Sequence, residues 1–266
     1  MNISKEELTE MLENKQFPLS AKYDPEWVVE NEMGPNALWL TEWLCGAMEL
    51  QPGMRVLDMG CGRAMSSVFL AKEFDVTVWA NDLWISAADN WQRVCLAGLE
   101  NRVFPIHAEA RSLPYAEGFF DAIVSLDSYH YYGTDDLYLR YFASFLKPGG
   151  QIGIVVPGLM RAFDGEVPEH LTRKTPSGAR FWDPTECFSF HTLDWWRRLW
   201  EQTGLVDVEL ADTLDDGWKH WLTFQEACVA AGKCRDEDEL PALRADQGRY
   251  LGFVRMVARH KGDASE

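Results

Sequence analysis

Short apolar segments alternate with helical segments from about residue 55 to residue 157, and this pattern restricts the fold more than any other feature of the chain. Five apolar segments bounded by turn residues predict strands at residues 55–59, 76–81, 103–107, 122–125 and 151–156. Apolar runs of this length are typical of a parallel sheet that is covered on both faces. Helical patterns lie between them, for example at 87–96 and at 136–146, where "KPGG" is expected to end the helix. The sequence therefore predicts an α/β fold with a doubly wound, mostly parallel sheet.

The segments on either side of this alternation predict additions to a single core. Residues 1–50 are expected to be helical, because Ser4 and Glu7 have the spacing of a capping box and an apolar stripe follows. Residues 158–191 lack a clean periodicity, as lids and substrate caps at sheet ends often do. Helices at 192–204 and around 218–230 and strands at 206–210 and 251–258 then resume the pattern. We expect an N-terminal helical lid at 1–50, an α/β core at 51–157, a cap insertion at 158–191 and the C-terminal part of the same core at 192–266.

The charge and the cysteines of the chain limit its expected partners. Among its 266 residues, 25 basic and 42 acidic side chains give a net charge of −17, which repels the phosphates of nucleic acids. The six cysteines are scattered and form no CxxC pair, so we expect reduced thiols and no metal site. The N-terminus does not resemble a signal peptide, and no stretch reaches the roughly 18 apolar residues of a membrane span. A cytoplasmic protein with neither a nucleic-acid nor a membrane partner is expected, and its oligomeric state is open.

The stretch "VLDMGCGRAMSS" at residues 56–67 predicts a ligand-binding turn. An apolar strand reaches Asp58, the chain passes Gly60 and Gly62, and a helix begins. The two glycines allow a sharp turn and a close approach of a ligand to the backbone, and the helix presents free N–H groups to an anion. Met65 stands where a dinucleotide-binding GxGxxG needs Gly or Ala, and no GK[ST] follows. On this stretch alone, a tight turn without a ligand is the alternative.

These residues resemble the first motif of the class I S-adenosylmethionine-dependent methyltransferases, an acidic residue followed by x-Gly-x-Gly-x-Gly. Asp58, Gly60 and Gly62 match that motif, and Ala64 replaces its third glycine. Four later segments resemble further motifs of the family in the same order, namely "VTVWANDLW", "IHAEARSLPY", "FDAIVSLDSYHYYG" and "LKPGGQIGIVV". The resemblance covers about residues 50–157. Five motifs in order favour a ligand site over a plain turn.

The resemblance implies a Rossmann-like sheet of seven strands and S-adenosylmethionine as cofactor, which is released as S-adenosylhomocysteine. The strand at 251–258 would be antiparallel and lie between the fifth and sixth strands. Ligands of such sheets bind beyond the carboxyl ends of the strands. The implied cofactor-binding residues are Tyr23, Asp58, Gly60, Gly62, Asp82, Leu83, Glu109, Ala110 and Ser125.

The resemblance implies particular roles for four of these residues. Asp82 would accept hydrogen bonds from both ribose hydroxyls, and Glu109 with the backbone of Ala110 would meet the adenine edge. Tyr23 belongs to the N-terminal segment, which folds over the cofactor in related enzymes. An ordinary aromatic residue beside a helix is the alternative for Tyr23.

His130 is the candidate base for the reaction. Methylation of a hydroxyl, a protonated amine or an acidic carbon requires removal of a proton, and the ordinary histidine pKa of about 6.5 suits that task. Small-molecule O-methyltransferases acting on natural-product sugars often have a histidine similar to His130. Alternatively, His130 packs among Tyr129, Tyr131 and Tyr132 and only shapes the pocket. Cyclopropane fatty acid synthases resemble this segment but have Glu-His-Phe-Gly where this chain has His-Tyr-Tyr-Gly, so lipid cyclopropanation is not expected.

The candidate substrate-binding residues are Tyr129, Tyr131, Tyr132, Arg161 and Trp182. Together with the basic residues of the same region, they predict two different kinds of acceptor. The aromatic rings suit a planar or cationic acceptor. The basic residues at 161, 173, 174 and 180 suit a carboxylate or phosphate, or they are solvated surface charges. The sequence leaves the charge of the acceptor open.

We therefore predict an S-adenosylmethionine-dependent methyltransferase that acts on a small molecule by O- or N-methylation, with His130 as candidate base. One alternative is C-methylation of a small or lipid-like metabolite. A second alternative is a regulatory protein that binds S-adenosylmethionine without catalysis, because a fold does not guarantee its chemistry. A nicotinamide-dependent oxidoreductase is disfavoured by Met65.

Overall fold

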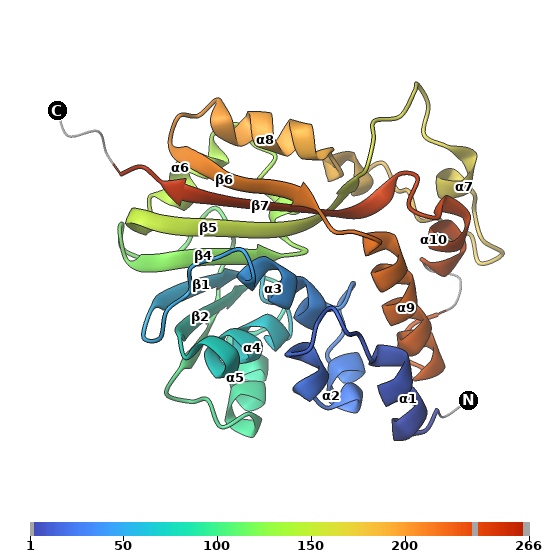
Figure 1. Ribbon diagram of the computed structural model, residues 1–266, viewed down its shortest axis with the longest axis horizontal. Helices are drawn as coiled ribbons and strands as arrows, with labels where there is room; N and C mark the ends of the chain where they lie inside the picture. Colours follow the sequence, from blue (N-terminus) through green and yellow to red (C-terminus); the bar gives the residue numbers. More distant parts are fainter. Residues whose placement is uncertain (1–2, 236–238, 263–266) are drawn as a thin grey trace.

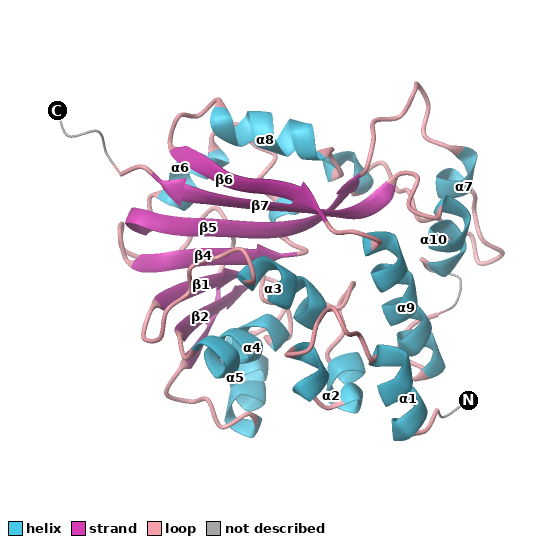
Figure 2. Cartoon of the chain, viewed as in Figure 1, coloured by secondary structure: helices cyan, strands magenta, loops and turns pink. Residues whose placement is uncertain are grey.

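One seven-stranded sheet lies between two layers of helices in the computed structural model, which describes residues 3–235 and 239–262 (Figures 1 and 2). The strands are β1 (Arg55–Met59), β2 (Thr77–Asp82), β3 (Val103–His107), β4 (Phe120–Leu126), β5 (Leu146–Leu159), β6 (Val206–Thr213) and β7 (Leu251–His260). Their order in the sheet is β3-β2-β1-β4-β5-β7-β6. The first five strands are parallel, and β7 is antiparallel to both β5 and β6. The predicted fold class and the predicted place of the last strand are confirmed.

Both faces of the sheet are buried, which explains why its strands are nearly continuous apolar runs. Consecutive side chains of a strand point to opposite faces, so Val56 belongs to one core and Leu57 to the other. The core around Val56 includes side chains of α3 (Ala37–Cys45), α4 (Met65–Phe74) and α5 (Ala87–Leu96). The core around Leu57 includes side chains of α6 (Tyr138–Ala143) and α8 (Leu193–Glu201).

Helices from both ends of the chain meet beyond one end of the sheet (Figure 1). From the N-terminal part these are α1 (Lys5–Leu12), the short 3₁₀ turn η1 (Ser20–Lys22) and α2 (Pro25–Glu30), and from the C-terminal part α9 (Gly217–Ala230) and α10 (Leu240–Asp246). The predicted capping box starts α1, because the backbone N–H of Glu7 donates to Ser4 Oγ at 3.2 Å and that of Ser4 donates to Glu7 Oε2 at 2.9 Å. No helix in the described ranges has the length and apolarity needed to cross a membrane.

The predicted helix at 136–146 is wrong at its C-terminal end. α6 ends at Ala143, and β5 begins at Leu146, so "KPGG" lies inside a strand and does not end a helix. Leu146 pairs with Phe120 and Gln151 pairs with Ala122, so the residues between form an irregularity in the ladder. Gly149, with φ +78°, supplies the left-handed conformation that this bulge contains.

Residues 158–191 form a mostly irregular segment that packs near the start of β7 and against α9. After β5 it contains the short helix α7 (Glu169–Thr172) and the 3₁₀ turn η3 (Cys187–Ser189). Its aromatic side chains make the contacts: Phe163 packs on Tyr250, and Phe181 packs on Trp221 of α9.

Candidate active site

β1 ends in a tight loop whose backbone is fastened to the end of β2. The N–H groups of Gly60 and Cys61 donate to the Asn81 carbonyl at 2.8 and 3.1 Å. Gly60 and Gly62 have φ values of +74° and +51°, which favour glycine. Ala64, at the third glycine position of the family motif, has φ +61°, so an alanine adopts a left-handed conformation at the start of α4. The loop therefore presents bare backbone at the carboxyl end of β1.

Asp58 holds β1 to α4 from below this loop. Its side chain is fully buried, and Oδ2 accepts hydrogen bonds from the hydroxyls of Ser66 and Ser67, both at 2.6 Å. Oδ1 has no hydrogen-bond partner among the residues that the structure describes. Burial raises the pKa of Asp58 to about 6, although the two serines oppose the shift. Its carboxyl group is therefore a buried support of the loop.

Asp82 organises the loop and the segment that follows β2. One carboxylate oxygen accepts a hydrogen bond from Gly62 N at 2.8 Å, and the other accepts from Trp84 N at 2.7 Å and Ile85 N at 2.8 Å. The side chain is almost buried but borders the cavity. Because each carboxylate oxygen accepts about two hydrogen bonds, Oδ2 can accept another from a ligand.

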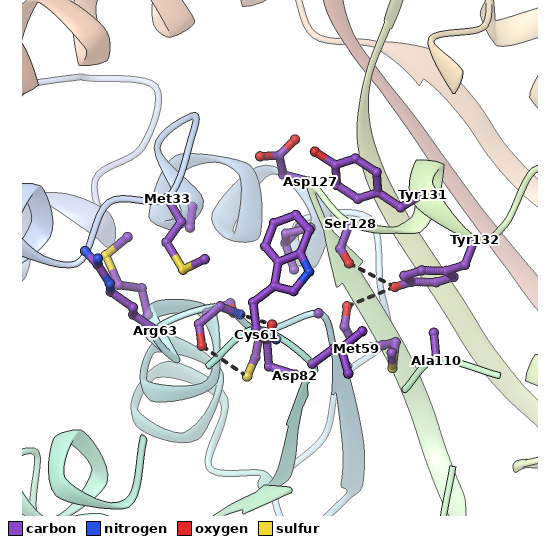
Figure 3. A pocket seen from close by; sticks show the side chains of 18 of the residues that line it. Met33, Met59, Cys61, Arg63, Asp82, Ala110, Asp127, Ser128, Tyr131 and Tyr132 are labelled. Carbon is purple, nitrogen blue, oxygen red and sulfur yellow. Dashed lines mark hydrogen bonds between the residues drawn. The ribbon is translucent and has the colours of Figure 1, made fainter. Parts of the chain in front are cut away.

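A cavity lies above the loop, at the carboxyl ends of β1, β2 and β4 (Figure 3). Its empty space, including the open mouth, is about 1010 Å³. The residues predicted from sequence that line it are Gly60, Gly62, Asp82, Leu83, Glu109, Ala110, Tyr131 and Tyr132. Motifs far apart in the chain therefore meet at one place.

Two further predicted residues lie behind the cavity wall and support it. Ser125 Oγ donates to the Met59 carbonyl at 2.8 Å and lies 3.0 Å from Tyr132 Oη, so it positions the Tyr132 ring that lines the cavity. Tyr129 is fully buried, and its ring packs against Phe142 and Trp196. Its apolar surroundings explain why it does not reach the cavity.

The structure places Tyr23, Arg161 and Trp182 away from this cavity. Tyr23 packs on Trp27 and Phe69, and its hydroxyl donates to Glu73 at 3.3 Å. The Arg161 guanidinium lies 4.5 Å from the centre of the Tyr250 ring. Trp182 is buried against aromatic neighbours of its own segment. All three side chains are therefore held in place by contacts with nearby aromatic rings.

His130 also lies outside the cavity wall, in the 3₁₀ turn η2 (Tyr129–Tyr131). Its side chain is 1% exposed, and its ring packs on Tyr131 with 4.0 Å between centroids. Nδ1 has no hydrogen-bond partner within the described part of the chain. Burial lowers the pKa of His130 to about 3, so the ring is neutral at physiological pH.

We expect His130 to reduce the stability of the protein as the pH falls below about 6.5. The unfolded chain binds a proton on this histidine near its ordinary pKa, whereas the folded pKa is about 3. The unfolded state therefore binds more protons in this window, so the free energy of unfolding falls with decreasing pH. The loss due to His130 is about 2 kcal/mol at about pH 5, from 1.36 kcal/mol per pH unit.

Urea unfolding of the wild type and of His130→Phe at about pH 7.5 and about pH 5 measures this difference. The variant should lose about 2 kcal/mol less than the wild type on acidification. His107→Gln, a change at an exposed histidine, is the control and should keep the wild-type loss. An equal loss in wild type and His130→Phe would contradict the depressed pKa.

The cavity also contains residues that the sequence analysis did not single out, above all Asn31, Met33, Arg63, Trp84 and Asp127. Asp127 comes directly after β4 and Trp84 is the second residue after β2, so the rule that ligands bind at carboxyl ends could have found them. Asn31 and Met33 come from the N-terminal segment, which the resemblance predicts to fold over the cofactor. Among the described residues, no three or more His, Cys, Asp or Glu side chains converge on a possible metal ion.

The mostly parallel sheet, the glycine loop after β1 and the acidic residue at the end of β2 are the arrangement of an α/β fold of the Rossmann-like class. Residues 56–150 match the family described as "Methyltransferase domain". This part of the chain is therefore similar to methyltransferase domains, and the two curated relatives that follow are methyltransferases.

Two curated relatives share part of the sequence. The chain is 33% identical over 181 residues to Methyltransferase GfsG of Streptomyces halstedii, a match that covers 65% of this chain and 60% of the relative. It is 31% identical over 118 residues to 27-O-demethylrifamycin SV methyltransferase of Amycolatopsis mediterranei, which covers 43% of each chain. The matches thus span less than two thirds of either relative.

A solved structure shares the fold over nearly the whole chain. It is a geranyl diphosphate C-methyltransferase from Streptomyces coelicolor A3(2) in complex with Mg²⁺, geranyl-S-thiolodiphosphate and S-adenosyl-L-homocysteine. The TM-score is 0.67 at 15% identity, and the match covers 97% of this chain and 85% of that one.

Proposed function

We propose that this protein is a methyltransferase that uses S-adenosylmethionine to methylate a small molecule. The observation that carries the proposal is the cavity, where the bare backbone of Gly60 and Gly62 and the Asp82 carboxylate lie beside an aromatic compartment. When bound, S-adenosylmethionine supplies a methyl group on a positively charged sulfur, which is already a good leaving group.

The residues at the cavity fit this cofactor. A Cβ added at Gly60 would lie 1.9 Å from Ser128 Oγ, so the turn requires a residue without a side chain. In the proposed complex the loop backbone holds the amino-acid part, Asp82 Oδ2 accepts a hydrogen bond from a ribose hydroxyl, and Leu83 with Glu109 and Ala110 contacts the adenine. These residues bind and orient the reactants and exclude water, which is the main contribution a protein makes to such a displacement.

The N-terminal segment is the proposed lid. Asn31, Met33, Pro35 and Ala37 line the cavity, which supports a lid within residues 1–50. Residues 158–191 are not part of the lining, and Arg161 and Trp182 are engaged with aromatic neighbours. We therefore do not include these two residues in the proposed substrate site.

O- or N-methylation is the proposed reaction, with C-methylation as the alternative. A role of His130 as base has little support, because the ring is buried and its pKa is depressed to about 3. Its contact with Tyr131, whose ring lines the cavity, supports a role in holding that ring in place.

A transfer assay with methyl-deuterated S-adenosylmethionine tests the proposed function. Purified protein is incubated with fractions of a small-molecule extract, and labelled products are detected by mass spectrometry. We expect a labelled small molecule with the wild type and none with Asp82→Ala. If the protein binds S-adenosylmethionine but labels nothing, a regulatory binding protein replaces the methyltransferase. If NAD raises the melting temperature and S-adenosylmethionine does not, a nicotinamide-dependent protein replaces it.

A further inference from the structure

The cavity contains a carboxylate that no described side chain neutralises. Asp127 directly follows β4, lines the cavity and has φ +51°, a conformation uncommon for residues other than glycine. Its backbone N–H donates to the Val155 carbonyl of β5 at 2.8 Å. Its carboxyl group makes no hydrogen bond or ion pair with any residue that the structure describes. The side chain is therefore anchored through its backbone, and its carboxyl oxygens remain available to a ligand.

The N-terminal segment encloses this carboxyl group from one side. A Cβ added at Gly34 would lie 2.6 Å from Asp127 Oδ2, so the glycine leaves the space that the carboxyl group occupies. The Gln225 side chain of α9 donates a hydrogen bond to the Gly34 carbonyl at 3.2 Å and so holds Gly34 beside the carboxyl group. Desolvation raises the pKa of Asp127 well above its ordinary value, and the charge of Glu239 adds to the shift. A cation beside Asp127 would offset this cost and keep the carboxylate ionised.

Two aromatic rings stand at the same part of the cavity. Tyr131 and Trp84 both line it and are 47% and 67% exposed, and their ring centroids are 5.6 Å apart at an angle of 58°. Figure 3 shows the Tyr131 ring close to the Asp127 carboxyl group. The faces of tyrosine and tryptophan rings attract cations, so rings and carboxylate favour the same charge on a ligand.

The basic side chains near the cavity already have partners of their own. Arg63 donates to the carbonyls of Glu30 and Glu32, both at 3.0 Å, and Arg111 pairs with Glu109 at 3.1 Å. In the segment 158–191, Arg173 pairs with Glu169 and Arg180 pairs with Asp183. These arginines are therefore engaged, and the net charge of −17 further favours a positively charged acceptor.

We propose that Asp127, Tyr131 and Trp84 bind the protonated amine of the acceptor, so that the substrate is a small molecule with a basic amine. This inference rests on the methyltransferase function proposed above. The carboxylate forms a charge-assisted hydrogen bond with the ammonium group, and the two rings contact its other sides. The site thereby excludes acceptors whose only charge is negative.

The charge of the labelled product is the first test. Products made by the wild type with methyl-deuterated S-adenosylmethionine are separated by ion exchange near neutral pH into cationic, neutral and anionic pools. We expect the label in products that carry a basic amine, which mass spectrometry of each pool identifies, and none in products whose only charge is negative. Label only in products without a basic amine would overturn the amine site and leave the methyltransferase function intact. Absence of label from all pools, under conditions where S-adenosylmethionine binds, would overturn the methyltransferase function itself.

The second test measures KM for the purified acceptor in Asp127→Asn and Tyr131→Leu. We expect Asp127→Asn to raise KM about 10- to 100-fold, as loss of one charge-assisted hydrogen bond does. The affinity for S-adenosylmethionine, measured by calorimetry, should stay unchanged. Glu186→Gln is the control, because this exposed carboxylate also acts on Tyr131 but does not line the cavity. A KM for Asp127→Asn equal to that of the control would overturn the proposal.

Discussion

Asp82→Ala is expected to reduce the affinity for S-adenosylmethionine by at least about 100-fold, since it removes about 3 kcal/mol of charge-assisted hydrogen bonding. The Asp82 carboxylate accepts hydrogen bonds from three backbone N–H groups, those of Gly62, Trp84 and Ile85. Its loss both frees the glycine loop and removes the proposed acceptor for a ribose hydroxyl. Isothermal titration calorimetry of wild type and variant gives the two affinities.

Two further variants make this measurement specific. Asp82→Asn keeps the shape but replaces one acceptor oxygen with a donor, so it should also lose most of the affinity. Asp164→Ala removes an exposed aspartate that does not line the cavity and should bind like the wild type. If folded Asp82→Ala binds within about threefold of the wild type, a difference below 1 kcal/mol, the cofactor does not depend on this carboxylate.

Gly60→Ala is expected to lower the free energy of unfolding by about 3 kcal/mol, the sum of a left-handed backbone penalty and steric overlap. The added Cβ would lie 1.9 Å from Ser128 Oγ and 2.3 Å from Ser128 Cβ, and φ is +74°. The loop and the residues after β4 would have to move apart, so cofactor binding should be lost as well. Urea unfolding measures the stability, and calorimetry measures the binding.

Gly53→Ala is the matched control for this substitution. Gly53 has φ +82°, but nothing lies within 4 Å of an added Cβ, so only the backbone penalty of about 1 kcal/mol remains. Ser128→Gly combined with Gly60→Ala should recover the part of the loss that is due to overlap. Equal losses in Gly60→Ala and Gly53→Ala would show that the contact with Ser128 is not tight.

The sequence predicts the sheet well because its pattern is local. The strands at 55–59 and 103–107 coincide with β1 and β3, since short apolar runs between turn residues have few other solutions in an α/β chain. The helix at 136–146 is wrong at its C-terminal end, because Pro148 and Gly149 are compatible with both a helix stop and a strand bulge. The pairing of Leu146 with Phe120 decides between them, and this is a contact distant in sequence.

The cavity residues likewise divide into those that a local sequence pattern predicts and those that depend on contacts distant in sequence. Gly60, Gly62 and Asp82 could be predicted because they lie at or shortly after strand ends in a recognisable motif. His130, Arg161 and Trp182 could not be placed, because the choice between a buried aromatic cluster and a ligand site depends on tertiary packing. The importance of Asp127 depends on its having no ion-pair partner among the described residues, which only the folded arrangement shows.

The crystal structure of the protein with S-adenosylhomocysteine tests the central claim most directly. We predict ordered density for the ligand against the loop at Gly60 and Gly62, with its ribose at Asp82. The part of the cavity beside Asp127 and Tyr131 should remain free for the acceptor. Density for the ligand in another hollow, such as the groove lined by Tyr23, Lys72 and Arg93, would contradict the proposed site.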